Sequence, residues 1–283
     1  MFATSLYDLH LHDRGSVGFP AEIRPVEQDL LAVDKQNAEA NLAVEAWKVL
    51  KAHWHVKGDL NSAGARQLTR SVFRQVLAIC HSPQYEIDHK DSLAQDWAHI
   101  PIPKDKALLK TIAKMGDQVA TLLNPLLDAD RIIASLLGDK APTLAVLQKR
   151  GGGPVRESEL LVTFSYYGAA AGRWCGRPPV ELEAQHRKWG DRTGDLLNRE
   201  VYFANVPEKV WRYELGGYPV LKKWLGYRDE KRRAGQPLSL ADTRHFRSMV
   251  QRIAALLILH EKLDMLYETA TADCFSAEGL NLR

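Results

Sequence analysis

Two short segments contain histidines at a spacing that could bind a metal ion. Apolar and polar residues alternate from Leu6 to Leu11, as in a half-buried strand, and on such a strand His10 and His12 of Asp8–Asp13 (DLHLHD) would point to one side. In many hydrolases the first metal ligands lie on a strand of this kind near the N-terminus. A metal-dependent hydrolase that uses DLHLHD is therefore one function to consider, and it remains the alternative function. The sequence that follows lacks the alternating strands and helices of the barrel that such a site needs. His53-Trp54-His55 ends a helical pattern, where alternate residues diverge, so surface or core histidines are the favoured interpretation.

Basic side chains are concentrated in two stretches, where they could neutralise the phosphates of DNA. The segment from Lys222 to Arg252 contains nine Lys and Arg residues and three acidic residues. This is a local excess of six positive charges, in a chain with a formal net charge of +3. The second stretch interleaves arginine and lysine with Trp174 and Trp189 in loop-like sequence. Solvated charge remains the alternative for both stretches, with the tryptophans as core anchors. The predicted DNA-binding residues are Lys222, Lys223, Arg228, Arg232, Arg233, Arg173, Arg177, Lys188 and Arg192.

The composition is that of an ordinary globular protein, with 45% hydrophobic and 26% charged residues and a pI near 8.6. Its three widely spaced cysteines form neither a disulfide framework nor a zinc knuckle. The N-terminus lacks the features of a signal peptide, and no apolar stretch is long enough to span a bilayer. We therefore expect a cytoplasmic protein with no metal site and no membrane partner.

The hydrophobic pattern predicts an α+β fold, with a helical N-terminal part, a small mixed or antiparallel sheet and C-terminal helices. We expect residues 1–130 to form the helix-rich part and residues 131–283 a second lobe, with a flexible point at Gly151–Pro154. Ser239 or Asp242 could cap the last helix. The predicted helices are Asn37–His53, Ala65–Cys80, Asp105–Leu123, Val220–Tyr227 and Leu240–Tyr267, and the predicted strands are Leu6–Leu11, Leu160–Tyr167, Glu200–Ala204 and Val210–Leu215.

The aromatic residues near the basic stretch have a spacing that suits packing between a strand and a helix. We therefore expect a core role for Trp211, Tyr213, Tyr218, Trp224 and Tyr227. His260 lies on the apolar stripe of the last helix and is expected to be a core histidine.

Three stretches carry a family resemblance. The first is Val76–Tyr85, a helix pattern ending in His-Ser-Pro-x-Tyr, and the second is Asp96–Pro103. The third runs from Leu196 to Tyr267 and includes NVPEKVWRY and GGYPVLKKWLGYR. Together they resemble the C-terminal specificity region of type ISP restriction-modification enzymes and related fused adenine methyltransferases. Ala98 and His99 replace the family's usual Pro-Arg pair, so no contact of that arginine is carried over.

The resemblance implies recognition of a DNA target rather than catalysis. In such enzymes a preceding domain transfers a methyl group from S-adenosylmethionine to adenine, and this region selects the sequence. The Asn124–Leu127 segment (NPLL) lacks the second proline and the aromatic residue of the adenine site, and Gly151–Gly153 does not follow an apolar strand. We expect no Rossmann methyltransferase domain and no cofactor in this chain. The expected partners are double-stranded DNA and a methyltransferase domain or subunit, which would hold S-adenosylmethionine; whether the chain is a fragment, a separate subunit or a remnant stays open.

Overall fold

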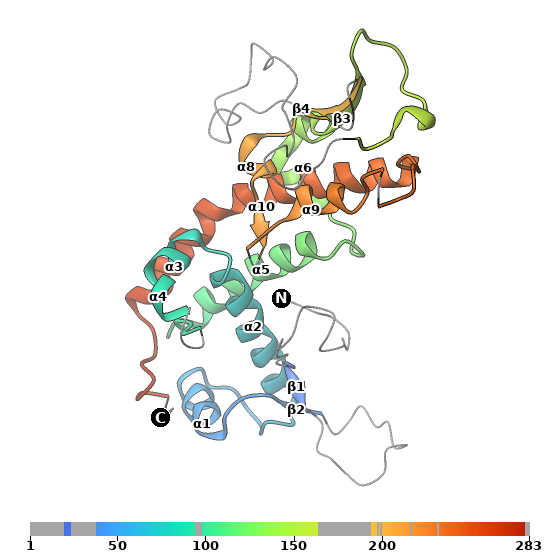
Figure 1. The fold of residues 1–283 in the computed structure, drawn as a ribbon. Helices are drawn as coiled ribbons and strands as arrows, with labels where there is room; N and C mark the ends of the chain where they lie inside the picture. The colour runs from blue at the N-terminus through green and yellow to red at the C-terminus, as the bar shows by residue number, and fades with distance from the viewer. Residues whose placement is uncertain are drawn as a thin grey trace, which may run out of the picture. The chain divides into compact units, whose positions relative to one another are not determined.

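The computed structural model describes residues 20–23, 38–93, 98–163, 194–196, 198, 200–215, 217–230 and 232–280. Figure 1 shows their fold, and they divide into two compact units: the described residues of Met1–Asn124 with Leu259–Arg283, and those of Pro125–Ile258. Helix α10 (Leu240–Ala272) contributes residues to both units. The division predicted after residue 130, which would place the whole of this helix in the second lobe, stays a prediction.

The first unit is built mainly from helices. These are α1 (Val44–His53), α2 (Ala63–Ile79), α3 (Pro83–Asp88), α4 (Lys90–Leu93), α5 (Lys106–Leu123) and the end of α10. A short antiparallel pair, β1 (Glu22–Ile23) and β2 (Glu39–Ala40), completes the unit. Ser62 caps α2 by accepting a hydrogen bond from the backbone N–H of Ala65, and Asp105 caps α5 in the same way.

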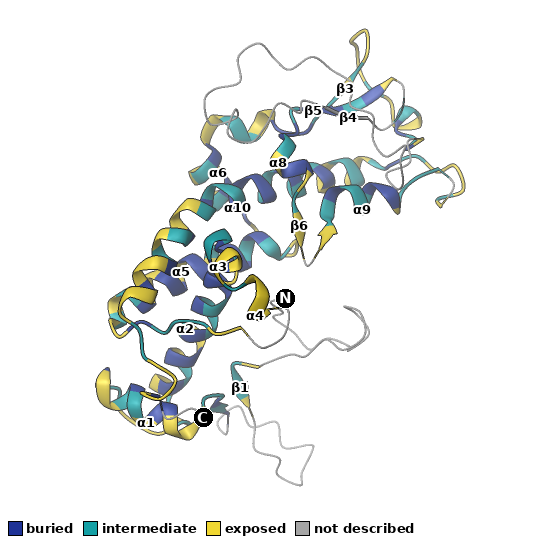
Figure 2. Cartoon of the chain, turned by 60° about the vertical axis from the view of Figure 1, so that its left-hand side comes forward, coloured by how far each residue is buried: buried dark blue, intermediate teal, exposed yellow. Residues whose placement is uncertain are grey.

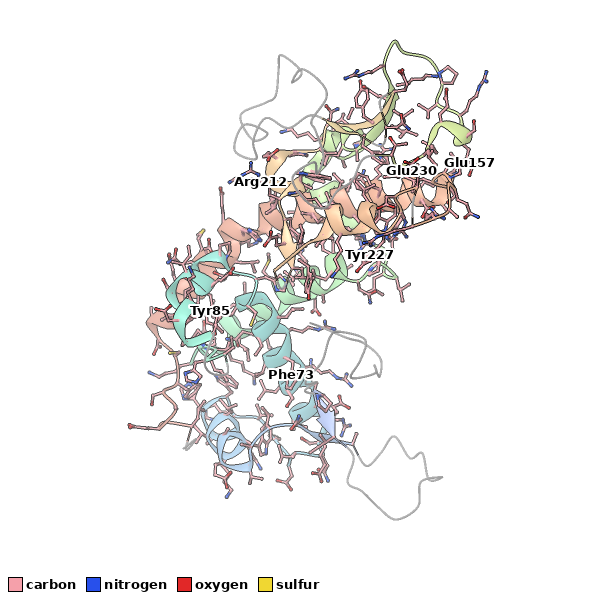
Figure 3. The ribbon with its side chains drawn as sticks, in the orientation of Figure 1. Phe73, Tyr85, Glu157, Arg212, Tyr227 and Glu230 are labelled. Carbon is pink, nitrogen blue, oxygen red and sulfur yellow. The ribbon has the colours of Figure 1, made fainter. Side chains whose placement is uncertain are left out.

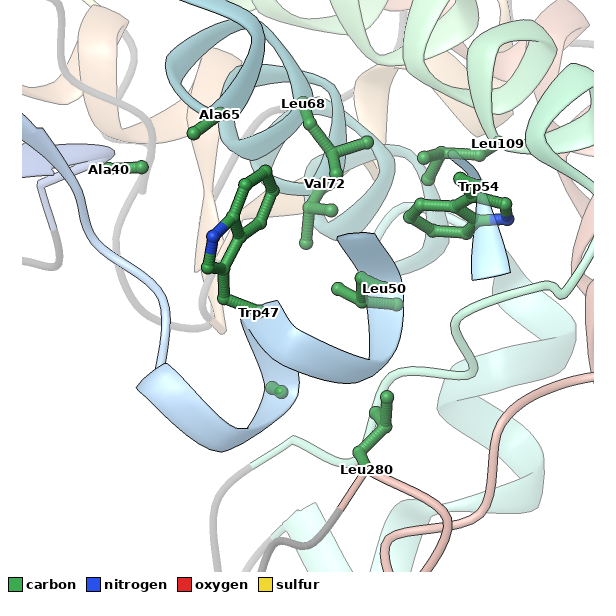
Figure 4. Close-up of a cluster of buried hydrophobic side chains, with 10 residues drawn as sticks. Ala40, Trp47, Leu50, Trp54, Ala65, Leu68, Val72, Leu109 and Leu280 are labelled. Carbon is green, nitrogen blue, oxygen red and sulfur yellow. The ribbon is translucent and has the colours of Figure 1, made fainter. Parts of the chain in front are cut away.

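The core of the first unit lies between α2 and α5 and continues onto α1. Ile112 and Val119 of α5 are fully buried, and Figure 2 shows buried stretches along both helices. Trp47, Leu50 and Trp54 pack with residues of α2 and α5 in the cluster of Figure 4. The helices approach most closely at Gly116, where a Cβ atom would lie 1.9 Å from the backbone oxygen of Arg74. Glycine is therefore required at this crossing.

The second unit contains a three-stranded antiparallel sheet in the order β3 (Val146–Lys149), β5 (Val201–Ala204) and β4 (Gly194–Leu196). Phe203 of β5 is buried and stacks on Phe246 of α10, with 4.2 Å between ring centroids. The remaining elements are α6 (Asp130–Leu137), the 3-10 helices η2 (Gly138–Thr143) and η3 (Glu157–Glu159), α8 (Glu208–Trp211), the hairpin β6 (Glu214–Leu215) and β7 (Tyr218–Pro219), α9 (Val220–Gly226) and the start of α10.

The predicted α+β class is confirmed, and the small antiparallel sheets of the described residues are unlike a Rossmann fold. The helices predicted over Ala65–Cys80 and Asp105–Leu123 are also confirmed, as is the strand over Glu200–Ala204. The helix predicted over Leu240–Tyr267 is present and continues to Ala272. In the described ranges, no helix is both long and apolar enough to cross a membrane.

Several predicted elements were wrong or incomplete. The helix predicted from Asn37 begins at Val44, because Ala40 pairs with Glu22 in the β1–β2 ladder. The strand predicted over Val210–Leu215 is helical at its start, and only Glu214–Leu215 is extended. Within Leu160–Thr163 there is a single bridge, from Val162 to Asp229, and the rest of that predicted strand lies outside the described residues, as does Leu6–Leu11. Helix α6 and strand β3 were not predicted.

Candidate DNA interface

A tight hairpin presents the residues before α9 at the surface of the second unit. Leu215 of β6 lies opposite Tyr218 of β7, so only two residues form the turn. One of them, Gly217, has a φ of +77°, a conformation that favours glycine in two-residue turns. The N–H of Val220 donates to the oxygen of Tyr213 at 3.2 Å, which ties the start of α9 to the hairpin. Leu215 and Tyr218 are 42% and 49% exposed, and the hairpin appears as an exposed element in Figure 2.

Two lysines follow the hairpin on α9. The Nζ atom of Lys223 lies 3.5 Å from the ring centroid of Tyr218, and that of Lys222 lies 5.8 Å from the ring of Trp211. Among the ion pairs of the described residues, none involves either lysine. Within the described part of the chain, no carboxylate neutralises their positive charges.

Two of the predicted DNA-binding arginines, Arg228 and Arg233, form ion pairs with an aspartate. Asp242 accepts hydrogen bonds from Arg228 Nε at 3.2 Å and Arg233 Nη1 at 3.1 Å, and also from the backbone N–H and Oγ of Ser239 at 3.0 Å each. Burial by itself would raise the pKa of this carboxyl, but the hydrogen bonds from Ser239 and the two guanidinium groups outweigh it and lower the pKa to about 2. The arginines thus hold the loop before α10 onto the start of that helix.

The same aspartate helps to begin α10. The N–H of Asp242 donates to Ser239 Oγ at 3.0 Å, so the two residues cap each other reciprocally. The sequence had proposed either residue as the cap, and the structure uses both.

The remaining cations of this stretch have mixed surroundings. Arg232 has a 48% exposed side chain, and its Nε lies 3.9 Å from Asp229 Oδ2. Its Cζ lies 5.3 Å from the ring centroid of Tyr227, which is labelled in Figure 3. Arg247 donates to the backbone oxygen of Pro142, whereas Arg244 is exposed. Lys231 and the whole second basic stretch, with Arg173, Arg177, Arg187, Lys188 and Arg192, lie outside the described residues.

The aromatic residues near α9 do not share one role. Trp211 is 2% exposed, which confirms the core position expected for it. Tyr218 and Tyr227 are 49% and 54% exposed, so the same expectation is wrong for these two. The signal for Tyr218 was present in the sequence, because the preceding Gly-Gly pair predicts a tight turn with its flanking residues at the tip.

The His-Ser-Pro-x-Tyr motif has a structural role in the first unit. Asp264 of α10 accepts hydrogen bonds from Ser82 Oγ at 2.5 Å and from the N–H of Gln84 at 3.0 Å. Tyr85 is buried beside Tyr267, with 5.4 Å between ring centroids, and is labelled in Figure 3. The motif therefore attaches α3 to the end of α10.

The described residues give no support to the metal-dependent alternative. No group of three or more potential ligands is assembled among them, and the segment with His10 and His12 lies outside them. His53 Nε2 instead lies 3.1 Å from the backbone oxygen of Lys104. His55 has a φ of 51° and lies in the turn that follows α1, two residues after its last residue.

Comparison with known proteins identifies the class of this chain. The family model for the type ISP C-terminal specificity domain matches residues 1–132 and 158–256. The chain belongs to this family, and membership supports a role in DNA target recognition.

Among solved structures, a chain of the cryoEM structure of a DrdV–DNA complex is similar, with 16% sequence identity and a TM-score of 0.43. The similarity covers 81% of this chain but only 20% of the other, so this chain spans about a fifth of that protein's length. No curated protein matches the sequence.

Proposed function

We propose that this chain selects the DNA target of a restriction-modification system whose adenine-N6 methyltransferase is a separate domain or subunit. Family membership supports the proposal, and one structural observation carries it: Lys222 and Lys223 lie on α9 next to an exposed hairpin, and no carboxylate of the described residues pairs with them. S-adenosylmethionine would bind to the methyltransferase partner, and the present chain would supply the choice of sequence.

The residues of the two basic stretches would have different roles in DNA binding. Phosphate contacts fix the position of a protein on DNA, whereas contacts to base edges select the sequence. We assign Lys222, Lys223 and Arg232 to the phosphates, since their side chains follow the exposed hairpin or lie in the adjoining loop. Arg228 and Arg233 would act indirectly, by holding that loop through Asp242. Base reading is proposed for the second basic stretch, with Arg173, Arg177, Lys188 and Arg192.

Fluorescence anisotropy with a labelled mixed-sequence duplex tests the electrostatic part of the proposal. We expect binding at low ionic strength with a linear dependence of log affinity on log salt concentration. The double substitution Lys222→Gln with Lys223→Gln should weaken binding and reduce the magnitude of the salt slope by about 2, because two phosphate contacts are lost.

A matched control separates this contact from a general effect of charge. Lys110→Gln with Lys114→Gln removes the same two charges from exposed positions on α5 and should leave the salt slope unchanged. Equal losses in the two double variants would contradict a local interface at α9. No binding by the unmodified chain, either alone or with its methyltransferase partner, would refute the proposed function.

Selection from a pool of randomised duplexes tests the target-recognition part. The chain should enrich one sequence, and that sequence should contain the adenine which the methyltransferase partner modifies. Enrichment of no sequence, by the chain alone and with its partner, would mean that DNA binding here is non-specific.

A further inference from the structure

We propose that Tyr218 is a positioning residue that holds the ammonium group of Lys223 in place for a DNA phosphate. The inference rests on the proposed function and adds a specific mechanism to it, a preformed cation–aromatic pair at the tip of the β6–β7 hairpin. The phosphate contact itself is made by Lys223.

The hairpin gives the tyrosine ring a defined place. Tyr218 is directly opposite Leu215, next to a two-residue turn, and the adjoining backbone is tied down by the hydrogen bond from Val220 to Tyr213. About half of the Tyr218 surface is exposed, although large aromatic residues are usually buried in a core. Packing in the interior therefore does not account for a tyrosine at this position.

The ammonium group of Lys223 packs on one face of the Tyr218 ring. Lys223 Nζ lies 3.5 Å from the ring centroid, well inside the distance of about 6 Å at which a cation is attracted to an aromatic ring. A lysine side chain has four flexible carbons and loses much rotational freedom when it binds a phosphate. A ring that already restrains the ammonium lowers that loss, so the pair should bind DNA more tightly than a free lysine would.

The other cation–aromatic pairs nearby in the described part of the chain do not combine these properties. Lys222 also lacks a carboxylate partner there, but its Nζ lies 5.8 Å from the ring of Trp211, which is buried. Arg228 lies 3.8 Å from the ring of Trp224, but its charge is bound to Asp242. Arg232 is 5.3 Å from the ring of Tyr227 and lies near Asp229. In this part of the second unit, Lys223 has the short ring contact and no carboxylate partner, which is why the proposal concerns Tyr218.

A double-mutant cycle in DNA binding tests the pair. We expect Tyr218→Leu to weaken binding to a mixed-sequence duplex by roughly two- to five-fold, the range given by exposed cation–aromatic contacts. Tyr218→Phe keeps the ring and should bind like the unmodified chain. In a Lys223→Gln background, Tyr218→Leu should have no further effect, because the cation that the ring holds is gone. Circular dichroism should show that all variants melt as the unmodified chain does.

The outcomes separate the inference from the proposed function. If the unmodified chain binds DNA but Tyr218→Leu binds equally well, the inference is wrong and the proposed function stands. An equal loss for Tyr218→Phe and Tyr218→Leu, or a loss that persists in the Lys223→Gln background, would also overturn the inference, since the hydroxyl or the fold would then be responsible. If the unmodified chain does not bind DNA, the inference and the proposed function are both wrong.

Discussion

Replacement of Gly116 by alanine is expected to destabilise the first unit, despite alanine's preference for helices. Gly116 lies inside α5, where alanine would by itself stabilise the helix by about 1 kcal/mol. The added Cβ would, however, lie 1.9 Å from the backbone oxygen of Arg74 and 2.6 Å from its carbonyl carbon. Because both atoms belong to the backbone of α2, no side chain can rotate away, and the two helices must separate by more than an ångström.

The expected loss follows from these two opposing effects. Overpacking of a core costs about 1–3 kcal/mol, and a backbone clash belongs at the upper end of that range. After the helix preference is subtracted, we expect a net loss of about 2 kcal/mol, which lowers the Tm by about 4–8 °C for a domain of this size. Thermal unfolding followed by circular dichroism measures the change.

Gly64 provides the matched control. It also lies in a helix, α2, but a Cβ atom there would meet Val56 Cγ1 at 3.4 Å and the oxygen of Lys57 at 3.5 Å, which are ordinary contacts. Gly64→Ala should therefore leave the Tm unchanged or raise it by a few degrees, about 2–4 °C at most. A Gly116→Ala variant at least as stable as the unmodified chain would refute the close helix crossing.

Two further substitutions test hydrogen-bond networks. Asp264→Ala removes the acceptor of the buried Ser82 hydroxyl and should lower the free energy of unfolding, measured with denaturant, by about 1–3 kcal/mol. The control Thr269→Ala loses only an exposed hydrogen bond to the oxygen of Met265 and should be nearly neutral. Equal effects of the two substitutions would contradict the role of Asp264. Asp242, whose pKa is lowered to about 2, should contribute roughly 2 kcal/mol above the unfolded pKa near 3.9, and this contribution should disappear as the pH falls from about 4 to about 2. The stability difference between the unmodified chain and Asp242→Asn should shrink over that interval, and a difference independent of pH would argue against the Arg228–Asp242–Arg233 network.

The helices were predictable wherever one apolar face repeats over several turns. Helix α5 shows this best, because Ile112, Met115 and Val119 are buried on one side and Asp105 caps the start. The strand predicted at Val210–Tyr213 was wrong. Its β-branched and aromatic residues favour strands, but Val210 and Trp211 are buried in a single helical turn after Pro207. A turn this short has no periodicity for the sequence to reveal.

The basic stretch illustrates what the sequence could not show. Local composition identified an excess of positive charge, and DNA binding by the lysines of α9, which have no carboxylate partner among the described residues, stays a prediction. The same composition gave no sign that Arg228 and Arg233 share the carboxylate of Asp242, which lies 14 and 9 residues further along the chain. Such pairing depends on how the loop folds back onto α10, and charge counting treats a paired arginine and a free lysine alike.

The chemistry of the two cations explains this division of roles. A guanidinium group is planar and offers several donors in fixed directions, so it can join a carboxylate, a backbone oxygen and an aromatic ring at once. Arg228 does this: it contacts Asp242, the oxygen of Trp224 and the ring of Trp224. An ammonium group carries its charge at one point on a flexible stem and suits a contact that forms only when a phosphate arrives. In the proposed function, Arg228 and Arg233 would therefore hold the surface in shape, and the lysines of α9 would bind the phosphate that approaches it.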